Sequence, residues 1–277
     1  MTDSAALAGV MGWPIHHSLS PRLHGWWLQH YGIKGHYVPL PVAPEKLEQA
    51  LRALPALGFA GCNVTVPHKE NAFALMDRHG ATAARIGSVN TVVVEADGSL
   101  TGHSTDGIGF TNSLRQEAPG FIPGKVMLLG AGGAARAVVD ALQQLGATEI
   151  RLVNRTQERA EQVATELGGV TVVNWAERSE ALREVNLVIN STSLGLIGQP
   201  PLDLDFSPLP ADAVAYDIVY NPLETAFLKQ AAAVGARTVS GIGMLLHQAA
   251  PGFASWFGTT PEVTPELRQH VLAGLTP

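Results

Sequence analysis

The stretch that decides the fold is Lys125-Val-Met-Leu-Leu-Gly-Ala-Gly-Gly-Ala-Ala-Arg136, an apolar run that ends in glycines and leads into a helical pattern. A strand that enters a helix through Gly130-x-Gly132-x-x-Ala135 is typical of a dinucleotide-binding turn. Gly130 permits the tight turn, Gly132 lets the backbone approach a pyrophosphate, and Ala135 lets helix and strand pack closely. Amides at the helix start would hold the anion. The stretch predicts a phosphate-binding Rossmann turn, although an ordinary strand-turn-helix can need the same glycines.

The end of the next strand indicates which dinucleotide binds. The strand Glu149-Ile-Arg-Leu-Val-Asn154 is followed by Arg155 and Thr156, where an NAD-binding fold usually carries an acidic residue for the ribose 2′-hydroxyl. Arg155, with Arg159 a helical turn later, would instead offer two guanidinium groups to a 2′-phosphate. The alternative is a pair of surface arginines at a helix start, which the helix dipole disfavours. The pattern therefore favours NADP over NAD.

Composition limits the kind of protein. The chain has 277 residues, 46% hydrophobic and 15% charged, which fits one large or two modest domains. A net charge of -6 argues against partners such as nucleic acid or an anionic membrane. With a single cysteine, Cys62, and ten scattered histidines, neither a disulfide nor a metal site is predicted. Cys62 itself is expected to be a small buried hydrophobe.

Location and assembly are less constrained. The first residues lack a basic segment and a long apolar core, and no stretch is long enough to cross a bilayer, so a cytoplasmic enzyme is expected. Either a monomer or a homodimer is compatible with the sequence, since Trp256 and Phe257 are expected to be exposed aromatic residues.

Two serines near the beginning of the chain predict an anion site. Residues 7–13 indicate a buried strand, and residues 22–30 a helix with Ser20 as N-cap and Pro21 at the first helical position. Ser18 and Ser20 would then stand at the positive end of a helix, which favours a substrate carboxylate. A capping serine with a bystander explains the residues equally well.

A lysine and an aspartate are candidates for proton transfer. The run Gly61-Cys-Asn-Val-Thr-Val-Pro-His-Lys69 alternates, so that Asn63 and Thr65 share one face of a strand. Lys69 falls in the first turn of the next helix, where the dipole disfavours an ammonium, and can act as a general acid and base. Asp106 is either the N-cap of the helix that follows it or the partner that orients Lys69. A solvated lysine remains the alternative.

The remaining elements alternate regularly, as in a parallel sheet. Asn190-Ser-Thr192-Ser-Leu-Gly195 follows a strand, where its polar side chains could line the nicotinamide or ribose. Gln248 lies inside an apolar helix, as a ligand or a satisfied core amide. The predicted strands are 36–42, 89–95, 99–103, 170–175, 186–190, 213–220 and 237–241. The predicted helices are 44–54, 107–117, 135–145, 156–167, 176–184, 224–234, 242–257 and one from 264 that folds back on the N-terminal half, and 198–210 is a proline-rich surface linker.

Eight short motifs, in the order in which they occur along the chain, resemble those of the shikimate dehydrogenase family over essentially the whole chain. The resemblance implies an NADP-dependent oxidoreductase that interconverts 3-dehydroshikimate and shikimate by hydride transfer, in aromatic amino-acid biosynthesis. It also implies an α/β substrate domain of residues 1–104, completed by helices in 242–277, a doubly wound Rossmann-type NADP domain of residues 105–241, and an active site in the cleft between them. The motifs are Ser18-Leu-Ser20, Asn63-Val-Thr-Val-Pro-His-Lys69, Ser88-Val-Asn90-Thr91, Ser104-Thr-Asp106-Gly-Ile-Gly109, Gly130-Ala-Gly-Gly-Ala-Ala-Arg136, Asn154-Arg-Thr156, Tyr216-Asp-Ile-Val-Tyr220-Asn-Pro222 and Gly241-Ile-Gly-Met-Leu-Leu-His-Gln248.

The resemblance also implies the site residues. Lys69 and Asp106 would carry the catalysis, without a metal, because the ammonium can meet the charge of the alkoxide. The implied substrate contacts are Ser18, Ser20, Asn63, Thr65, Asn90, Tyr220 and Gln248. The implied cofactor contacts are Gly130, Ala131, Gly132, Gly133, Ala134, Asn154, Arg155, Thr156, Arg159, Thr192, Ile218 and Gly241.

Three other functions compete with this prediction. A quinate/shikimate dehydrogenase that accepts NAD is the nearest, although the serine pair and the arginine pair weigh against it. A folate-type methylene dehydrogenase shares the two-domain plan by analogy, but Asp106 next to Thr105 favours a polyol acid. A non-catalytic NADP sensor would not need an intact Lys69 and Asp106.

Overall fold

The protein, described here as a computed structural model over residues 5–275, folds into two compact units. The first contains Met1–Asp106 and Leu246–Thr276, and the second contains Gly107–Leu245. Residues 1–4 and 276–277, which open and close the predicted substrate domain, lie outside the described range. Each unit has its own six-stranded sheet, which confirms the predicted fold class of two α/β domains. Within residues 5–275, no helix has the length and apolar character to cross a membrane.

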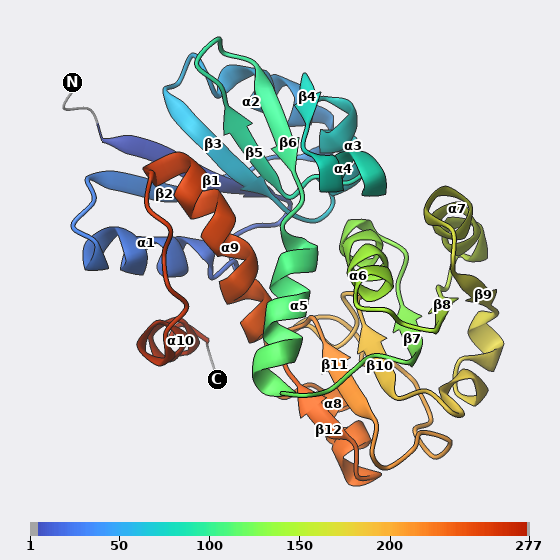
Figure 1. The fold of residues 1–277 in the computed structure, drawn as a ribbon. Helices are drawn as coiled ribbons and strands as arrows, with labels where there is room; N and C mark the ends of the chain where they lie inside the picture. Colours follow the sequence, from blue (N-terminus) through green and yellow to red (C-terminus); the bar gives the residue numbers. More distant parts are fainter. Residues whose placement is uncertain (1–4, 276–277) are drawn as a thin grey trace. The chain divides into compact units, whose positions relative to one another are not determined.

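The sheet of the first unit is mixed, with the order β2-β1-β3-β5-β6-β4 (Figure 1). β1 pairs in parallel with β2 and β3, whereas β5 runs antiparallel to both β3 and β6. Alternate side chains are buried on opposite faces, and α2, α3 and α4 supply the core of one face. Its strands are β1 (Ala6–Gly12), β2 (Gly35–Pro41), β3 (Phe59–Val64), β4 (Arg78–His79), β5 (Thr91–Val94) and β6 (Leu100–His103). Its helices are α1 (Ser20–His30), η1 (Pro44–Lys46), α2 (Leu47–Ala53), α3 (Lys69–Ala74), α4 (Ala81–Ile86), most of α9 (Ile242–Phe257) and α10 (Pro265–Leu272).

The sheet of the second unit is entirely parallel, with the order β12-β11-β10-β7-β8-β9 (Figure 1). This is the doubly wound nucleotide-binding order, and its topological switch point lies between β7 and β10. α5, α6 and α7 bury one face of the sheet, and α8 buries the other. The elements are α5 (Asp106–Glu117), β7 (Lys125–Leu129), α6 (Gly133–Gln144), β8 (Glu149–Val153), α7 (Gln157–Leu167), β9 (Thr171–Val173), η2 (Trp175–Glu177), η3 (Glu180–Leu182), β10 (Leu187–Asn190), β11 (Val214–Asp217), α8 (Ala226–Ala233) and β12 (Arg237–Val239).

The glycine turn between β7 and α6 has the geometry that its residues predict. Gly130 has a φ of 109°, and a Cβ there would lie 2.6 Å from Oγ of Ser191. Gly132 is the N-cap of α6, and a Cβ on it would meet nothing within 4 Å. Ala135 is fully buried against the sheet. Position 130 requires glycine, because a larger residue would be strained at this φ and would collide with Ser191. Gly132 faces open space that a ligand can enter.

Two local predictions near helix ends are wrong. Ser20 is the first residue of α1 and not its N-cap, which is Leu19, because the backbone is already helical there and Ser18 Oγ accepts a hydrogen bond from Ser20 N at 3.3 Å. The predicted helix 176–184 is replaced by the two short turns η2 and η3. Arg183 is extended, with a ψ of 128°, and Glu184 has a φ of 65°, so neither residue continues a helix.

The proline-rich segment 198–210 is not a surface linker, contrary to the prediction from its prolines. Leu202, Leu204, Phe206 and Leu209 are buried and join the core that α8 covers. Residues 202–206 alternate between buried leucine or phenylalanine and exposed aspartate, as an extended segment does on a core. The segment therefore forms part of the second unit's core.

The predicted exposure of Trp256 is also wrong. Its side chain is 5% exposed, and its indole Nε1 donates to the carbonyl oxygen of Val92 at 2.9 Å. Phe257 is half-buried. Two other predictions are confirmed: Cys62 is fully buried, which raises the pKa of its thiol to about 12, and α10 packs on α1.

Candidate active site

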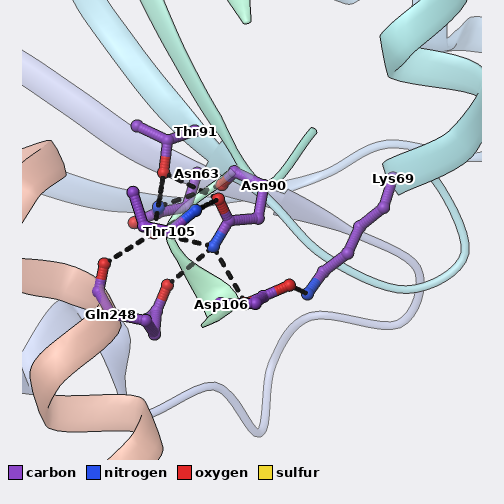
Figure 2. A network of polar contacts seen from close by, with 7 residues as sticks. All are labelled: Asn63, Lys69, Asn90, Thr91, Thr105, Asp106 and Gln248. Carbon is purple, nitrogen blue, oxygen red and sulfur yellow. Dashed lines mark hydrogen bonds and ion pairs between the residues drawn. The ribbon is translucent and has the colours of Figure 1, made fainter. Parts of the chain in front are cut away.

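A lysine and an aspartate meet in the first unit. Lys69 is the first residue of α3, Asp106 is the first residue of α5, and their Nζ and Oδ2 atoms are 2.5 Å apart (Figure 2). The side chains are only 14% and 6% exposed, so little water screens this ion pair. Asp106 therefore directs its carboxylate to Lys69 rather than acting only as a helix cap.

Asn90 organises the residues around this pair. Figure 2 shows its amide at the centre of the network, with Nδ2 2.9 Å from Asp106 Oδ1, 2.9 Å from Thr105 Oγ1 and 3.0 Å from Gln248 Oε1. Its Oδ1 accepts from the amide of Thr105 at 2.8 Å. Two N–H groups thus serve three acceptors, and the side chain is buried. Asn90 holds both Asp106 and Gln248 in place.

Asn63 is held from three sides. The phenol of Tyr37 donates to its Oδ1 at 2.6 Å, and its Nδ2 donates to the carbonyl of Asn90 at 3.0 Å and to Thr91 Oγ1 at 3.1 Å. Both N–H groups are therefore occupied, and Oδ1 has one lone pair left as an acceptor. Thr65, on the same predicted face, lies one residue beyond β3 and is half-buried.

The two serines lie at the start of α1. Ser20 is buried and Ser18 half-buried. Burial raises the pKa of Tyr37 well above 10.0, and a hydrogen bond with Ser20 opposes that shift. Ser20 thus lies close to Tyr37, whose phenol donates to Asn63.

Several residues of the network were missed at the level of sequence. Thr91 and Thr105 lie inside quoted motifs, and Thr105 Oγ1 donates to the carbonyl of Gln248 at 2.8 Å. Tyr37 gave no sequence signal, because a single tyrosine in an extended segment is usually a core residue. His24 stacks on Tyr37 with 3.9 Å between ring centroids, and burial lowers its pKa to about 3.

The second unit gathers the predicted cofactor residues at the carboxyl edge of its sheet. Ala131 is buried, while Gly132, Gly133 and Ala134 are half-buried at the start of α6. This open helix start fits a pyrophosphate. Arg155 and Arg159 are exposed after the neighbouring strand β8, where they fit a 2′-phosphate.

A side-chain hydrogen bond and a close backbone approach fix the loops at this edge of the sheet. Asn154 Nδ2 donates to the carbonyl of Thr156 at 2.7 Å, which fixes the turn before α7. Thr192 follows β10 and Ile218 follows β11. A Cβ on Gly241 would lie 2.1 Å from the carbonyl oxygen of Ile218, so only glycine permits this approach. The half-buried Tyr220 lies two residues beyond Ile218.

A Rossmann sheet with a phosphate-binding turn, in one chain with a closely paired lysine and carboxylate, defines a nicotinamide-nucleotide-dependent oxidoreductase. Residues 10–92 match the family described as "Shikimate dehydrogenase substrate binding domain", and residues 113–196 match "Shikimate / quinate 5-dehydrogenase". A shikimate dehydrogenase (NADP(+)) of Paramagnetospirillum magneticum is 56% identical over 276 residues, covering 99% of this chain and 100% of that protein. The chain belongs to the shikimate dehydrogenase family, as its motifs predict.

Two solved structures are similar over nearly the whole chain. Shikimate 5-dehydrogenase from Thermus thermophilus, in complex with NADP(H) and shikimate, is 35% identical with a TM-score of 0.87, covering 98% of this chain and 100% of that one. Quinate dehydrogenase from Corynebacterium glutamicum, in complex with NAD, is 30% identical with a TM-score of 0.88, covering 97% and 99%. This fold is therefore found both in a shikimate dehydrogenase, the predicted function, and in a quinate dehydrogenase, its main alternative.

Proposed function

We propose that this chain is a shikimate dehydrogenase that uses NADP and interconverts shikimate and 3-dehydroshikimate in the biosynthesis of aromatic amino acids. The observation that carries the proposal is the ion pair of Lys69 and Asp106 at 2.5 Å, in a chain that is 56% identical to a shikimate dehydrogenase (NADP(+)). A cytoplasmic location, and a monomeric or homodimeric state, remain predictions.

The paired side chains account for the proton. NADPH, when bound, supplies the hydride that reduces the ring ketone. The Lys69 ammonium gives one proton to the developing alkoxide, and Asp106 keeps the ammonium in position. In the reverse direction the Lys69 amine takes the hydroxyl proton, so that shikimate and NADP⁺ give 3-dehydroshikimate, NADPH and one proton. The charge on oxygen is met by the ammonium.

The polar residues suggest how the substrate is held. Ser18 and Ser20 would bind its carboxylate at the start of α1. Asn63 would accept a hydrogen bond from a ring hydroxyl, because its two N–H groups are already used. The remaining proposed ring contacts are Thr65, Asn90, Gln248 and, from the second unit, Tyr220.

NADP is the cofactor that the residues of the second unit fit. The glycine turn, Gly130 to Ala134, would bind the pyrophosphate, and Asn154, Arg155, Thr156 and Arg159 would surround the 2′-phosphate. Thr192, Ile218 and Gly241 would line the nicotinamide half.

The test is steady-state oxidation of shikimate and of quinate, each with NADP and with NAD. The Arg155→Ala variant is measured beside wild type, with Arg183→Ala as the control, because Arg183 is an exposed arginine paired with Glu180. We expect wild type to prefer shikimate with NADP. Arg155→Ala should raise KM for NADP about tenfold or more and leave KM for NAD nearly unchanged. Equal loss with both cofactors would contradict the 2′-phosphate role.

The strongest alternative is a dehydrogenase that accepts quinate or NAD. The 30% identical quinate dehydrogenase with a TM-score of 0.88 favours testing it. Comparable turnover of quinate, or comparable use of NAD, would move the assignment to this broader enzyme. Binding of NADPH without turnover of either acid would instead indicate a non-catalytic sensor.

A further inference from the structure

Three buried polar side chains form a cluster at the ends of two neighbouring strands in the second unit. Asn190 ends β10 and Asp217 ends β11, and the two residues are partners in the register of these parallel strands. Thr225 directly precedes α8. All three are fully buried, and the proton transfer described above does not use them. Asn190, Asp217 and Thr225 are called the strand-end cluster below.

The cluster fixes the segment that follows β10. Asn190 Oδ1 accepts hydrogen bonds from the amide and the hydroxyl of Thr192, at 3.1 and 2.7 Å. Its Nδ2 donates to the carbonyl of Leu194 at 3.1 Å and to Asp217 Oδ1 at 3.0 Å. One side-chain amide thus uses all its hydrogen-bonding groups to hold residues 191–194 against the next strand.

The cluster also fixes the segment that follows β11. Asp217 Oδ1 accepts from the amide of Val219 at 3.0 Å, and its Oδ2 accepts from the hydroxyl of Thr225 at 2.6 Å. The same hydroxyl accepts from an amide in the first turn of α8 at 3.2 Å. Residues 218–224 are therefore anchored at both ends, at their start by Asp217 and at their end by Thr225.

The two segments carry residues assigned to the cofactor. Thr192 is held by Asn190 directly, and the amide of Ile218 donates to the carbonyl of Asn190 at 3.0 Å. Ser191, which lies between Asn190 and Thr192 in the chain, packs on Gly130 of the glycine turn. The cluster also costs stability, since burial raises the pKa of Asp217 to about 6 in spite of its hydrogen bonds. Asp217 ends β11, the neighbour of β10, which borders the switch point of the sheet, and a buried carboxyl that costs stability there indicates a role in the loops it holds.

We propose that Asn190, Asp217 and Thr225 are positioning residues for the nicotinamide half of NADP, acting through Thr192 and Ile218. The proposal rests on the proposed function, because it takes NADP as the cofactor. It assigns no contact between the strand-end cluster and the cofactor itself.

The first experiment measures NADPH binding to Thr225→Val by titration calorimetry without substrate. Valine keeps the shape of threonine and removes the hydroxyl shared by Asp217 and α8. We expect the Kd for NADPH and the KM for NADP to rise about tenfold, because a buried hydrogen bond to a carboxylate that orders the loops is lost. The KM for shikimate should change by less than about twofold.

Two further variants separate positioning from helix capping. Thr225→Ser retains the hydroxyl and should bind NADPH within about twofold of wild type. Thr264→Val is the matched control, because Thr264 caps α10 in the first unit through its hydroxyl at 3.2 Å from the amide of Leu267. This variant should lose thermal stability and keep the wild-type Kd for NADPH.

A wild-type Kd for NADPH in Thr225→Val would overturn the proposal and leave the cluster a purely structural one. If Thr225→Val does not fold, as judged by circular dichroism, Asp217→Asn decides instead. It replaces one carboxylate oxygen with an amino group, so an unchanged Kd there also overturns the proposal, and an increase supports it. Failure of wild type to oxidise shikimate would contradict the proposed function separately, since NADPH binding is measured without substrate.

Discussion

Lys69 is the residue on which the proposed chemistry depends most directly. Lys69→Ala should lower kcat by about 10²–10⁴, because the group that gives and takes the proton is lost. The KM for shikimate should change little, since the serines and amides proposed to hold the substrate remain. Steady-state kinetics test this, with Lys46→Ala as the control, because Lys46 is exposed in η1. Near-normal turnover in Lys69→Ala would remove the catalytic assignment.

Asn90 acts on two groups at once. Asn90→Ala should lower kcat by about 10² and raise KM for shikimate, because Asp106 and Gln248 both lose the amide that positions them. Asn174→Ala is a suitable control, since that exposed asparagine caps η2 and bonds the exposed Gln157, away from the network around Asp106. Kinetic constants that change no more than in the control would contradict the organising role of Asn90.

Local sequence patterns can identify single site residues, but they cannot identify contacts between residues that lie far apart in the chain. Lys69 and Asp106 carry local signals, a helix start and a polar residue after a hairpin, so their side chains could be singled out. The sequence could not show that they meet, because 37 residues separate them. Nor could it show that the amide of Asn90 is occupied by Gln248, 158 residues away. Tyr37 was missed because its partner Asn63 lies on another strand.

At the scale of elements, the contribution of segment 198–210 to the core of the second unit can be tested by mutation. Phe206→Ala should destabilise the protein by about 3–5 kcal/mol, because it leaves a cavity in a core that four side chains of this segment share. Ile122→Ala, at a position 73% exposed, should cost less than about 0.5 kcal/mol. Urea unfolding followed by circular dichroism measures both. Equal costs would mean that the segment adds nothing to the core.

Most elements could be predicted because buried parallel strands are short apolar runs and helices have their own period. The strands β7 and β8, and the glycine turn that follows β7, are examples. The helix predicted at 176–184 is not formed, because the backbone is extended at Arg183 and has a positive φ at Glu184, and neither residue is a glycine or proline that would signal the break. The alternation of Leu202, Leu204 and Phe206 is a strand-like pattern that indicates burial. The flanking prolines instead led to the prediction of a surface linker.

At the scale of the whole molecule, two units with separate sheets and cores need not unfold in one step. Stability measurements should therefore follow each transition separately. Buried groups give each unit its own dependence on pH. In the second unit the strongest case is Asp217, which burial holds at a pKa of about 6 against an ordinary value of 3.8.

The sign of this dependence follows from linkage. Well below pH 3.8 both the folded and the unfolded chain hold the Asp217 proton. Between pH 4 and pH 6 the unfolded chain releases it first, so the free energy of unfolding falls as pH rises. The loss should reach about 3 kcal/mol by pH 7. An amide at this position cannot titrate, so Asp217→Asn should gain most of that amount, about 2 kcal/mol, relative to wild type between pH 4 and pH 7, on top of a constant offset from its altered hydrogen bonds. Urea unfolding at both pH values measures the difference, with Asp212→Asn as the control for loss of an exposed charge. A difference that does not change with pH would mean that Asp217 has the same pKa in the folded and the unfolded protein.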